Sequence, residues 1–421
     1  PGLLNKICHE LEIPPLDLEM SRREDFSDPF NGFCKYVYRE LSDKSLEMYD
    51  YVLIDEAQDL NPTFLKICDK ILKKGGKLVY AYDDFQTLSN TTLPSPNEIF
   101  DKSESIKTFP LSICYRTPPK ILVMAHALSM GIYRTPPTFY QFPAKPDDWN
   151  LMGYKMEKGS GQVGEETLLS RNGPECYSNL ETSFLDFCFS KENQGVFNYL
   201  VKCLEKDLND GMCPEDLMVI DLDGEKLNDD YYSLLDAIND NNQVSDSNQL
   251  KIYLSGSISP NAFRKKGCVT FSGIKRAKGN EAFKVYLLNA RKAMSEHFPI
   301  VWRNRLFTAI TRTRLQVMIV ESFENQYDEL FKKLESEITA AAKKDYKLEF
   351  KYPSDKEIQK IISAAKAEEE NISKYESINN KIDQIKQSSG IDTIIDVFNG
   401  LISSNLSPEE KEKLINLLKS K

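Results

Sequence analysis

Short apolar runs and helix-spaced apolar residues divide the chain into two α/β regions and a helical end. The first region contains, in chain order, a helix, a strand, a helix and a strand at Gly32 to Leu41, Met48 to Ile54, Pro62 to Leu72 and Lys77 to Tyr82. Gly75-Gly76 is expected to break the second helix. A continuous apolar run is typical of a strand covered on both faces, and strands that alternate with helices predict a parallel sheet. Residues 1–108 therefore predict part of a parallel α/β domain.

The second region repeats this pattern and predicts another α/β domain over residues 109–322. Its expected strands and helices are Phe109 to Ile113, Pro118 to Ser129, Val196 to Leu208, Leu217 to Ile220, Cys268 to Phe271, Val285 to Leu288 and Val317 to Val320. Between the first two helices, residues 133–179 are irregular and rich in Pro and Gly, and we interpret them as an insertion.

Residues 323–421 are rich in Lys, Glu, Ile and Ala, and helical spacing dominates there. Ser407-Pro-Glu-Glu410 combines a capping box with Pro in the first turn, which predicts a last helix. We expect an α-helical C-terminal tail. Either it packs on its own domain or it forms a coiled coil with a partner.

Composition excludes several classes of protein. The formal net charge is −10, so any surface that binds nucleic acid must be local. The chain has 9 Cys without a C-x-x-C pair and only 3 His, which argues against a zinc module and for reduced thiols in the cytoplasm. No apolar run approaches the roughly 18 residues that a membrane helix needs, and residues 1–14 lack a basic region followed by an apolar core, so we expect a soluble protein of the cytoplasm.

The run from Tyr51 to Asp59 places two acids, Asp55 and Glu56, directly after an expected buried strand. A carboxylate at the end of such a strand can hold a hydrated Mg²⁺, and an adjacent Glu can orient and deprotonate a water that attacks the γ-phosphate of ATP. The alternative is that the two acids cap the next helix, because Asp-Glu pairs are common.

Five segments in this order resemble the motifs of the UvrD/Rep-like superfamily 1 DNA helicases. The run from Tyr51 to Asp59 resembles motif II, which implies that Asp55 organises Mg²⁺, that Glu56 is the general base and that Gln58 links nucleotide and DNA states. Tyr82-Asp-Asp-Phe-Gln86 resembles motif III, which implies that Gln86 senses the γ-phosphate. The alternative for Gln86 is an ordinary polar residue in an acidic turn.

Leu111-Ser-Ile-Cys-Tyr-Arg-Thr117 resembles motif IV, and the segment from Asn304 to Arg314 resembles motif VI. The resemblance implies that Arg116 and Arg312 are arginine fingers, and such a finger can contribute about 10³ to 10⁵ in rate. A buried arginine paired with an acid would equally explain Arg116. Arg305 and Arg314 are expected to serve structure or pairing between domains.

The segment from Val269 to Glu281 resembles motif V. The resemblance implies that Gly279 and Glu281 lie at the ribose and phosphates of the nucleotide. The preceding turn would contact nucleic acid, with the expected contact residues Thr270, Lys275, Arg276 and Lys278. Three basic side chains beside a motif are the local charge that phosphate binding requires. A solvated surface without a ligand is the alternative, since clusters of this size are common.

The resemblance implies an α/β, RecA-like P-loop NTPase helicase core. Its partial first domain would be residues 1–108 and its second RecA-like domain residues 109–322, both with parallel sheets, followed by the α-helical tail. The implied cofactors are ATP and Mg²⁺. The implied partner is single-stranded DNA, with RNA as the alternative.

The phosphate loop of this family, G-x-x-x-x-G-K-S/T, does not occur in the sequence. Its backbone N–H groups and Lys normally hold the phosphates of ATP. We therefore expect these residues to be the carboxyl portion of an ATP-dependent helicase whose phosphate loop comes from a further segment or a companion subunit. The alternative is a module that binds nucleic acid or a partner protein without hydrolysing ATP, in DNA repair or anti-phage defence.

Overall fold

The computed structural model divides the chain into two compact units. Unit 1 comprises residues 1–84, 89–106 and 367–421, and unit 2 comprises residues 85–88 and 107–366. The structure describes residues 2–25, 28–41, 46–88, 94–100, 106–135, 139–171, 173–174, 187–192, 195–242, 250–322 and 328–368. The expected helices beyond residue 368, including the one opened by Ser407, lie outside these described residues.

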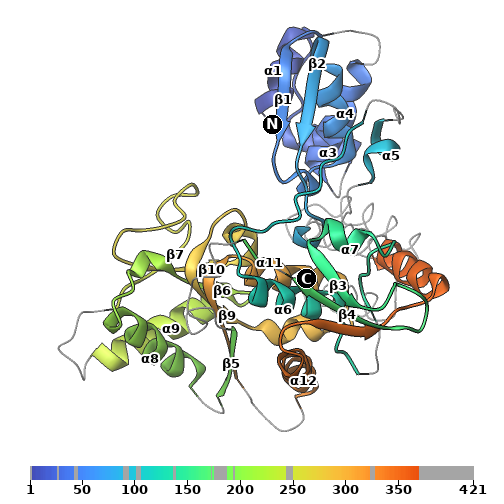
Figure 1. Cartoon of the computed structure of the whole chain (residues 1–421). Coiled ribbons are helices and arrows are strands. Elements are labelled where there is room, and N and C mark those ends of the chain that lie inside the picture. The colour runs from blue at the N-terminus through green and yellow to red at the C-terminus, as the bar shows by residue number, and fades with distance from the viewer. Residues whose placement is uncertain are drawn as a thin grey trace, which may run out of the picture. The chain divides into compact units, whose positions relative to one another are not determined.

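Unit 1 contains two parallel strands joined by a helix, as expected for its sequence (Figure 1). The order is β1 (Tyr49–Ile54), α4 (Pro62–Lys70) and β2 (Leu72–Tyr80). The Asn61 side chain accepts a hydrogen bond of 2.9 Å from the Phe64 backbone N–H, and Pro62 occupies the first turn, so the sequence fixes where α4 begins.

One detail of this region was predicted wrongly. Gly75-Gly76 does not end the helix, which stops at Lys70, but lies inside β2. The pairing of β1 with β2 shifts register there, from Tyr49 opposite Leu72 to Tyr51 opposite Lys77. Gly75 has φ +82°, a backbone conformation that a glycine adopts without strain. The two glycines therefore allow the strand to bulge.

Helices pack beside these strands to form the core of unit 1. They are α1 (Gly2–Glu10), α2 (Leu18–Glu24), α3 (Pro29–Glu40) and the short α5 (Pro96–Phe100). The helix expected at Gly32 to Leu41 is thereby confirmed. Leu4 and Ile7 of α1, Val37 of α3 and Ile67 of α4 are fully buried together. Burial of each such side chain stabilises the unit by about 1.5–3 kcal/mol.

The strands of unit 1 are not buried on both faces, which corrects the expectation from their apolar sequence. Leu53 is 75% exposed, and Tyr51 and Val79 are also exposed. Leu53 pairs with Val79 and Tyr51 with Lys77, so these side chains share one face of the two strands. Parallel sheets normally have both faces covered. The exposure of this apolar face is therefore unusual for a parallel sheet.

Unit 2 is built on six strands, and every pair of neighbours is parallel. The strand order across the sheet is β5 (Phe187–Glu192), β10 (Thr313–Ser322), β9 (Ala282–Leu288), β6 (Leu217–Asp221), β8 (Val269–Gly273) and β7 (Ile252–Leu254). The four strands expected between residues 217 and 320 are confirmed. All five residues of β6 are buried, as their continuous apolar sequence requires.

Helices cover both faces of this sheet (Figure 1). On one face lie α6 (Pro119–Met130), α11 (Pro299–Ile310) and α12 (Glu329–Lys343), which share a core with Met218 and Ile220 of β6. On the other face lie α8 (Val196–Asn209) and α9 (Leu227–Asn242), against Leu217 and Val219. None of the described helices is long and apolar enough to cross a membrane.

A second, smaller sheet of unit 2 corrects two expectations. It is antiparallel and consists of β3 (Tyr154–Lys158), β4 (Glu166–Arg171) and β11 (Leu348–Lys351), with α7 (Asp148–Leu151) beside it. The expected irregular insertion thus contains two strands. Part of the expected helical tail, residues 328–366, belongs to unit 2 and contributes α12, β11 and the first turns of a helix at 355–368.

Two further predictions about unit 2 were wrong in part. The expected amphipathic helix α6 is buried on all sides from Ile121 to Met130, and it ends at Gly131 with φ +72°. Residues 109–113, expected to form a strand, are extended but pair with no other strand among the described residues. Phe109, Leu111 and Ile113 point to solvent, and Leu111 is 89% exposed.

Short elements complete the fold. They are η1 (Ala57–Asp59), η2 (Asp84–Gln86), η5 (Pro214–Asp216), α10 (Ile274–Ala277) and η6 (Ala290–Met294).

A buried ion pair joins α11 to α12. Arg303 and Glu337 are 2% and 3% exposed, and the Arg303 guanidinium donates hydrogen bonds of 2.9 and 2.7 Å to the two Glu337 carboxylate oxygens. Arg303 also donates to the Leu128 carbonyl of α6. The pair therefore ties the helices on this face of the sheet to one another.

Arg303→Met is expected to lower the free energy of unfolding by about 3–5 kcal/mol, because it leaves the Glu337 carboxylate buried without its partner. The double variant Arg303→Met, Glu337→Leu is expected to recover most of this loss, since two apolar side chains replace the pair. Urea unfolding followed by circular dichroism measures both. Lys332→Met, at an exposed pair with Glu329, is the control and should change stability by less than about 0.5 kcal/mol. A double variant no more stable than the single one would contradict this account.

Candidate functional site

Two acidic side chains follow β1 at the end of the sheet in unit 1. Asp55 is exposed, and its Oδ1 accepts a hydrogen bond of 3.0 Å from the Glu56 backbone N–H. Glu56 has φ +52° and ψ +43°, the left-handed conformation that few non-glycine residues adopt. Strained backbone of this kind persists only where neighbours hold it, and it is common at functional sites.

Gln58 holds the Glu56 side chain and joins it to the turn after β2. Gln58 is buried, its Nε2 donates to Glu56 Oε2 at 2.6 Å, and its Oε1 accepts from the Asp83 backbone N–H at 3.2 Å. Ala57 N–H also donates to the Ala81 carbonyl at 2.8 Å. The predicted motif II and the start of the predicted motif III are therefore adjacent, and Gln58 bonds to both.

Gln86 belongs to unit 2, where it contacts residues from the predicted motifs V and VI. Its Oε1 accepts a hydrogen bond of 2.5 Å from Arg312 Nη2, and its carbonyl oxygen accepts one of 2.7 Å from Lys278 Nζ. Arg312 is fully buried, and its Nε donates to the Thr308 carbonyl at 3.0 Å. These residues lie far apart in the sequence, and the fold brings them together.

Phe85, which precedes Gln86, is anchored among aromatic rings of unit 2. Its ring centroid lies 5.2 Å from that of His126 and 5.4 Å from that of Phe307, which is on α11 with Thr308. His126 Nδ1 and the Tyr154 hydroxyl are hydrogen-bonded at 2.9 Å. Burial lowers the pKa of His126 to about 3, so this imidazole stays neutral and serves packing. The ring cluster fixes the backbone that presents Gln86.

Arg116 and Glu281 form an ion pair with a distance of 2.7 Å between Arg116 Nε and Glu281 Oε2. Arg314 Nε lies 3.6 Å from the other Glu281 oxygen. The neighbouring Thr117 hydroxyl donates to the Thr311 and Thr313 carbonyls at 3.2 and 3.3 Å. The predicted motifs IV, V and VI therefore meet at one place. Arg116 is paired with an acid, as its alternative interpretation expects, but its side chain is 39% exposed and not buried.

The expected nucleic-acid residues of motif V occupy different positions. Lys275 and Arg276 are exposed on α10 and Lys278 is half-buried, whereas Thr270 is only 1% exposed in the middle of β8. Both faces of this strand are covered, and the contact between Thr270 and nucleic acid stays a prediction. Gly279 has φ +80°, a backbone conformation that glycine adopts without strain, and no protein atom lies within 4 Å of the place that a Cβ would take.

The sequence analysis did not single out three consecutive basic residues before β8. Arg264, Lys265 and Lys266 are exposed in the loop between β7 and β8, and the Arg264 guanidinium donates to the Glu281 carbonyl. The signal was present as a run of three consecutive cations, but no motif pointed to it. Phe85 was also missed, since nothing in the sequence shows that it packs on His126.

Asp55 is the described residue that best fits a Mg²⁺ ion carried by a nucleotide. Mg²⁺ typically takes one or two carboxylates together with phosphate oxygens and water. No group of three or more His, Cys, Asp or Glu in the described parts of the chain is arranged to hold a metal on its own. The donor set fits a metal that arrives with phosphates.

Comparisons with known proteins add little. No protein-family model and no curated protein matches the chain. Among solved structures, it is similar to the C-terminal domain of a possible DNA helicase from Lactobacillus plantarum WCFS1, with 14% sequence identity and a TM-score of 0.26. The match covers 36% of this chain and 80% of that one. A similarity at this level carries no argument about fold or function.

Proposed function

We propose that this chain is the carboxyl portion of an ATP-dependent nucleic-acid helicase or translocase of the UvrD/Rep-like kind. The observation that carries the proposal is the meeting of four predicted motif residues in unit 2: Gln86 bonds to Arg312, and Arg116 bonds to Glu281. The partners are 226 residues apart in the sequence in the first pair and 165 residues apart in the second. Unrelated sequence matches would have no reason to converge in this way.

The roles follow from chemistry. Asp55 would hold the nucleotide-bound Mg²⁺, and Glu56, oriented by Gln58, would accept a proton from the attacking water. Arg312 and Arg116 would offset the negative charge that develops on the phosphates. Both arginines have protein partners at present, Gln86 and Glu281, so binding a nucleotide would require them to exchange these partners for phosphate oxygens.

The proposal requires a phosphate loop from a polypeptide outside these 421 residues. The uncovered face of β1 and β2 supports this requirement, because Tyr51, Leu53 and Val79 would be buried if further α/β structure packed there. The extended segment at 109–113, which pairs with no strand in the part of the chain that the structure describes, is a second, independent place in unit 2 where another strand could pair. The proposed partners are thus a phosphate-loop segment or companion subunit and single-stranded DNA or RNA.

A second candidate is a module that binds nucleic acid or a partner without hydrolysing ATP. The absence of the phosphate loop from the sequence favours it. The sequence nevertheless retains Asp55, Glu56 and Arg312, and a module that only binds its ligand has no physical need for these residues.

The test is purification of the native protein from its source cells, followed by intact-mass measurement and an assay of Mg-ATP hydrolysis with and without single-stranded DNA. We expect the native assembly to contain a G-x-x-x-x-G-K-S/T segment and to hydrolyse ATP faster when DNA is present, whereas the 421 residues alone do not hydrolyse it. A native assembly without such a segment would contradict the proposal, as would one that has the segment but does not hydrolyse ATP. Either result would favour the module that binds without hydrolysis.

A further inference from the structure

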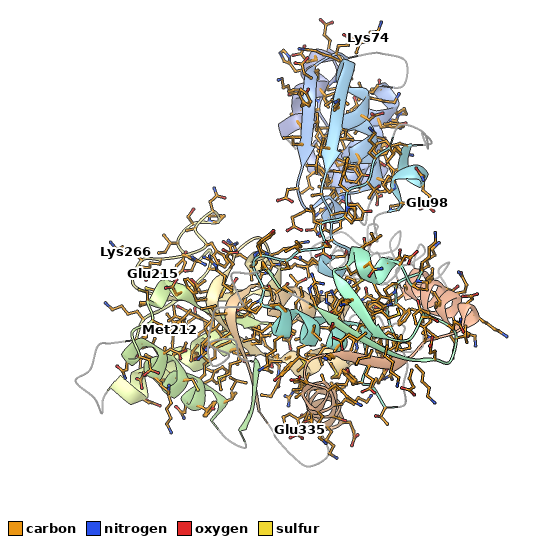
Figure 2. All side chains as sticks on the ribbon, viewed as in Figure 1. Lys74, Glu98, Met212, Glu215, Lys266 and Glu335 are labelled. Carbon is orange, nitrogen blue, oxygen red and sulfur yellow. The ribbon has the colours of Figure 1, made fainter. Side chains whose placement is uncertain are left out.

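The large sheet of unit 2 has two ends, and the proposed nucleotide residues occupy only one of them. All its neighbouring strands are parallel, so residues that precede the strands share one end and residues that follow them share the other. Glu281 directly precedes β9, Arg312 directly precedes β10, and Glu215, labelled in Figure 2, lies just before β6. Asp221 is the last residue of β6 and Asn289 directly follows β9, so both lie at the opposite, carboxyl end.

At this carboxyl end the chain changes direction between β6 and β9. After β6 it passes through α9 on one face of the sheet to β7, and after β9 it passes through α11 on the other face to β10. Because β6 and β9 are neighbours, their two connections leave in opposite directions from adjacent strand ends. Open α/β sheets commonly bind their ligands at such a switch point. The topology therefore directs attention to the polar residues there.

Two aspartates meet at the switch point. Asp221 is fully buried, and Asp230, in the first turn of α9, is half-buried. The Asn289 side chain lies between them, and its Nδ2 donates to Asp221 Oδ1 at 2.8 Å and to Asp230 Oδ2 at 2.7 Å. The two carboxyl groups are also close enough for a hydrogen bond to each other. We call Asp221 and Asp230 the carboxylate pair.

One oxygen of this pair has no donor. Asp221 Oδ1 accepts a second hydrogen bond, of 2.8 Å, from the Asp223 backbone N–H, whereas the buried Asp221 Oδ2 has no hydrogen-bond partner among the described residues. Two ionised carboxylates offer only acceptors, so they repel each other unless a proton or a cation lies between them. The same repulsion acts on the pKa of Asp221, which burial raises first and the charge of Asp230 raises further.

The basic side chains at this end of the sheet already have acidic partners. Lys292 Nζ lies 3.1 Å from Asp223 Oδ2, and Arg291 Nη1 lies 2.5 Å from Asp328 Oδ2. In the part of the chain that the structure describes, neither member of the carboxylate pair forms an ion pair. The charge that offsets the pair is therefore supplied from solution.

We propose that the carboxylate pair binds a Mg²⁺ ion, with Asp221 Oδ2, an Asp230 oxygen and the Asn289 amide oxygen as protein ligands and water at the remaining positions. Asn289 presents its oxygen after a half-turn of the amide, which exchanges Nδ2 for Oδ1. Asp230 is half-buried, so the ion reaches the site from solvent on the α9 side.

The number of ligands favours Mg²⁺ over Ca²⁺. Mg²⁺ usually takes one or two carboxylates and keeps several waters, whereas Ca²⁺ takes about 6–8 oxygen ligands. The described residues contain no group of three or more His, Cys, Asp or Glu that could hold a metal, so the pair needs an amide oxygen and water to complete the coordination. This ion would link β6, β9 and α9 at the end of the sheet opposite to Glu281 and Arg312. It is thus distinct from the Mg²⁺ carried by a nucleotide, and the inference does not depend on the proposed function.

The test counts bound Mn²⁺, which takes the same oxygen ligands as Mg²⁺, by the loss of the free-ion signal in electron paramagnetic resonance. It uses the full chain without nucleotide, near pH 8 so that the pair is ionised. The variants are Asp221→Asn and Asp230→Asn. Each keeps the side-chain shape and supplies an N–H that donates to the remaining carboxylate, so both are expected to fold. The control, Asp236→Asn, removes an exposed carboxylate from the same helix α9.

The wild type and the control should bind one Mn²⁺ ion more than either variant, and added Mg²⁺ should displace that ion. Thermal unfolding gives a second measurement. Millimolar MgCl₂, compared with NaCl of equal ionic strength, should raise the melting temperature of the wild type by about 2–4 °C and leave that of both variants unchanged. Without Mg²⁺, Asp221→Asn should melt above the wild type, because its amide replaces the contact between two carboxylates.

Equal Mn²⁺ binding by the wild type and both variants would overturn the proposal. A wild type that binds no such ion, but whose stability falls as the pH rises through about 7 while that of Asp221→Asn does not, would assign the pair to a shared proton and overturn it as well. Neither measurement uses ATP. A failure here therefore leaves the proposed ATP chemistry standing, and a failure of the hydrolysis assay leaves this result standing.

Discussion

Replacing Glu56 by Gln is expected to reduce ATP turnover by about 10²–10⁴-fold, the usual contribution of a positioned general base. Glutamine has nearly the same shape as glutamate and can still accept the hydrogen bond that Gln58 Nε2 donates at 2.6 Å. It cannot take a proton from water. The variant should therefore keep the fold and the affinity for nucleotide while losing the chemical step.

The measurement is a single-turnover assay on the chain assembled with its phosphate-loop segment, together with a separate measurement of nucleotide binding. Asp59→Asn is the matched control, because it removes an exposed carboxylate from the same turn and should leave turnover within about threefold. Turnover of Glu56→Gln equal to that of the wild type would remove Glu56 from the proposed role. Loss of nucleotide binding in parallel with turnover would point to a structural effect instead.

Replacing Arg312 by Ala is expected to slow hydrolysis by about 10³-fold or more, as loss of an arginine finger does. Arg312 is fully buried and bonds to Thr308 and Gln86, so the change also removes structural contacts. Arg312→Lys separates the two effects. It keeps a positive charge but loses the planar fork that can bond a phosphate and a protein oxygen at once, so it should fold normally and remain strongly impaired.

Thermal unfolding and single-turnover hydrolysis of both variants would be compared with those of Arg314→Ala, whose half-exposed side chain lies 3.6 Å from Glu281. That control should lose little rate. Gln86→Ala combined with Arg312→Ala should cost about as much as Arg312→Ala alone, because partners in one hydrogen bond are not additive. Normal hydrolysis by a folded Arg312→Lys protein would exclude the finger role.

The central strands of the large sheet could be predicted because their sequences are continuous apolar runs. Leu217 to Ile220 is a continuous apolar run, which is typical of a strand covered on both faces. The strands that were missed are half-exposed and polar, such as Tyr154–Lys158 and Leu348–Lys351. The strand expected at 109–113 failed for another reason: its propensity is right, but pairing depends on a partner strand that propensity does not describe.

The candidate site shows the same limit. Motif order predicted that Arg116, Glu281 and Arg312 would act together, and the structure places them close to one another. Spacing did not show that Thr270 is buried within β8, or that Arg276 of α10 bonds to the Pro260 carbonyl of the preceding loop. Both facts depend on contacts between segments that are distant along the chain.

The extended segment that contains Phe109, Leu111 and Ile113 also has a consequence for handling the protein. An exposed apolar extended segment that pairs with no strand among the described residues is a template for pairing with an identical segment, the first step towards insoluble fibres. Pro110 interrupts the row of N–H donors and so acts as a gatekeeper against such stacking. Solubility of the isolated chain should therefore depend strongly on concentration, and Pro110 is the residue that a stabilising redesign should leave in place.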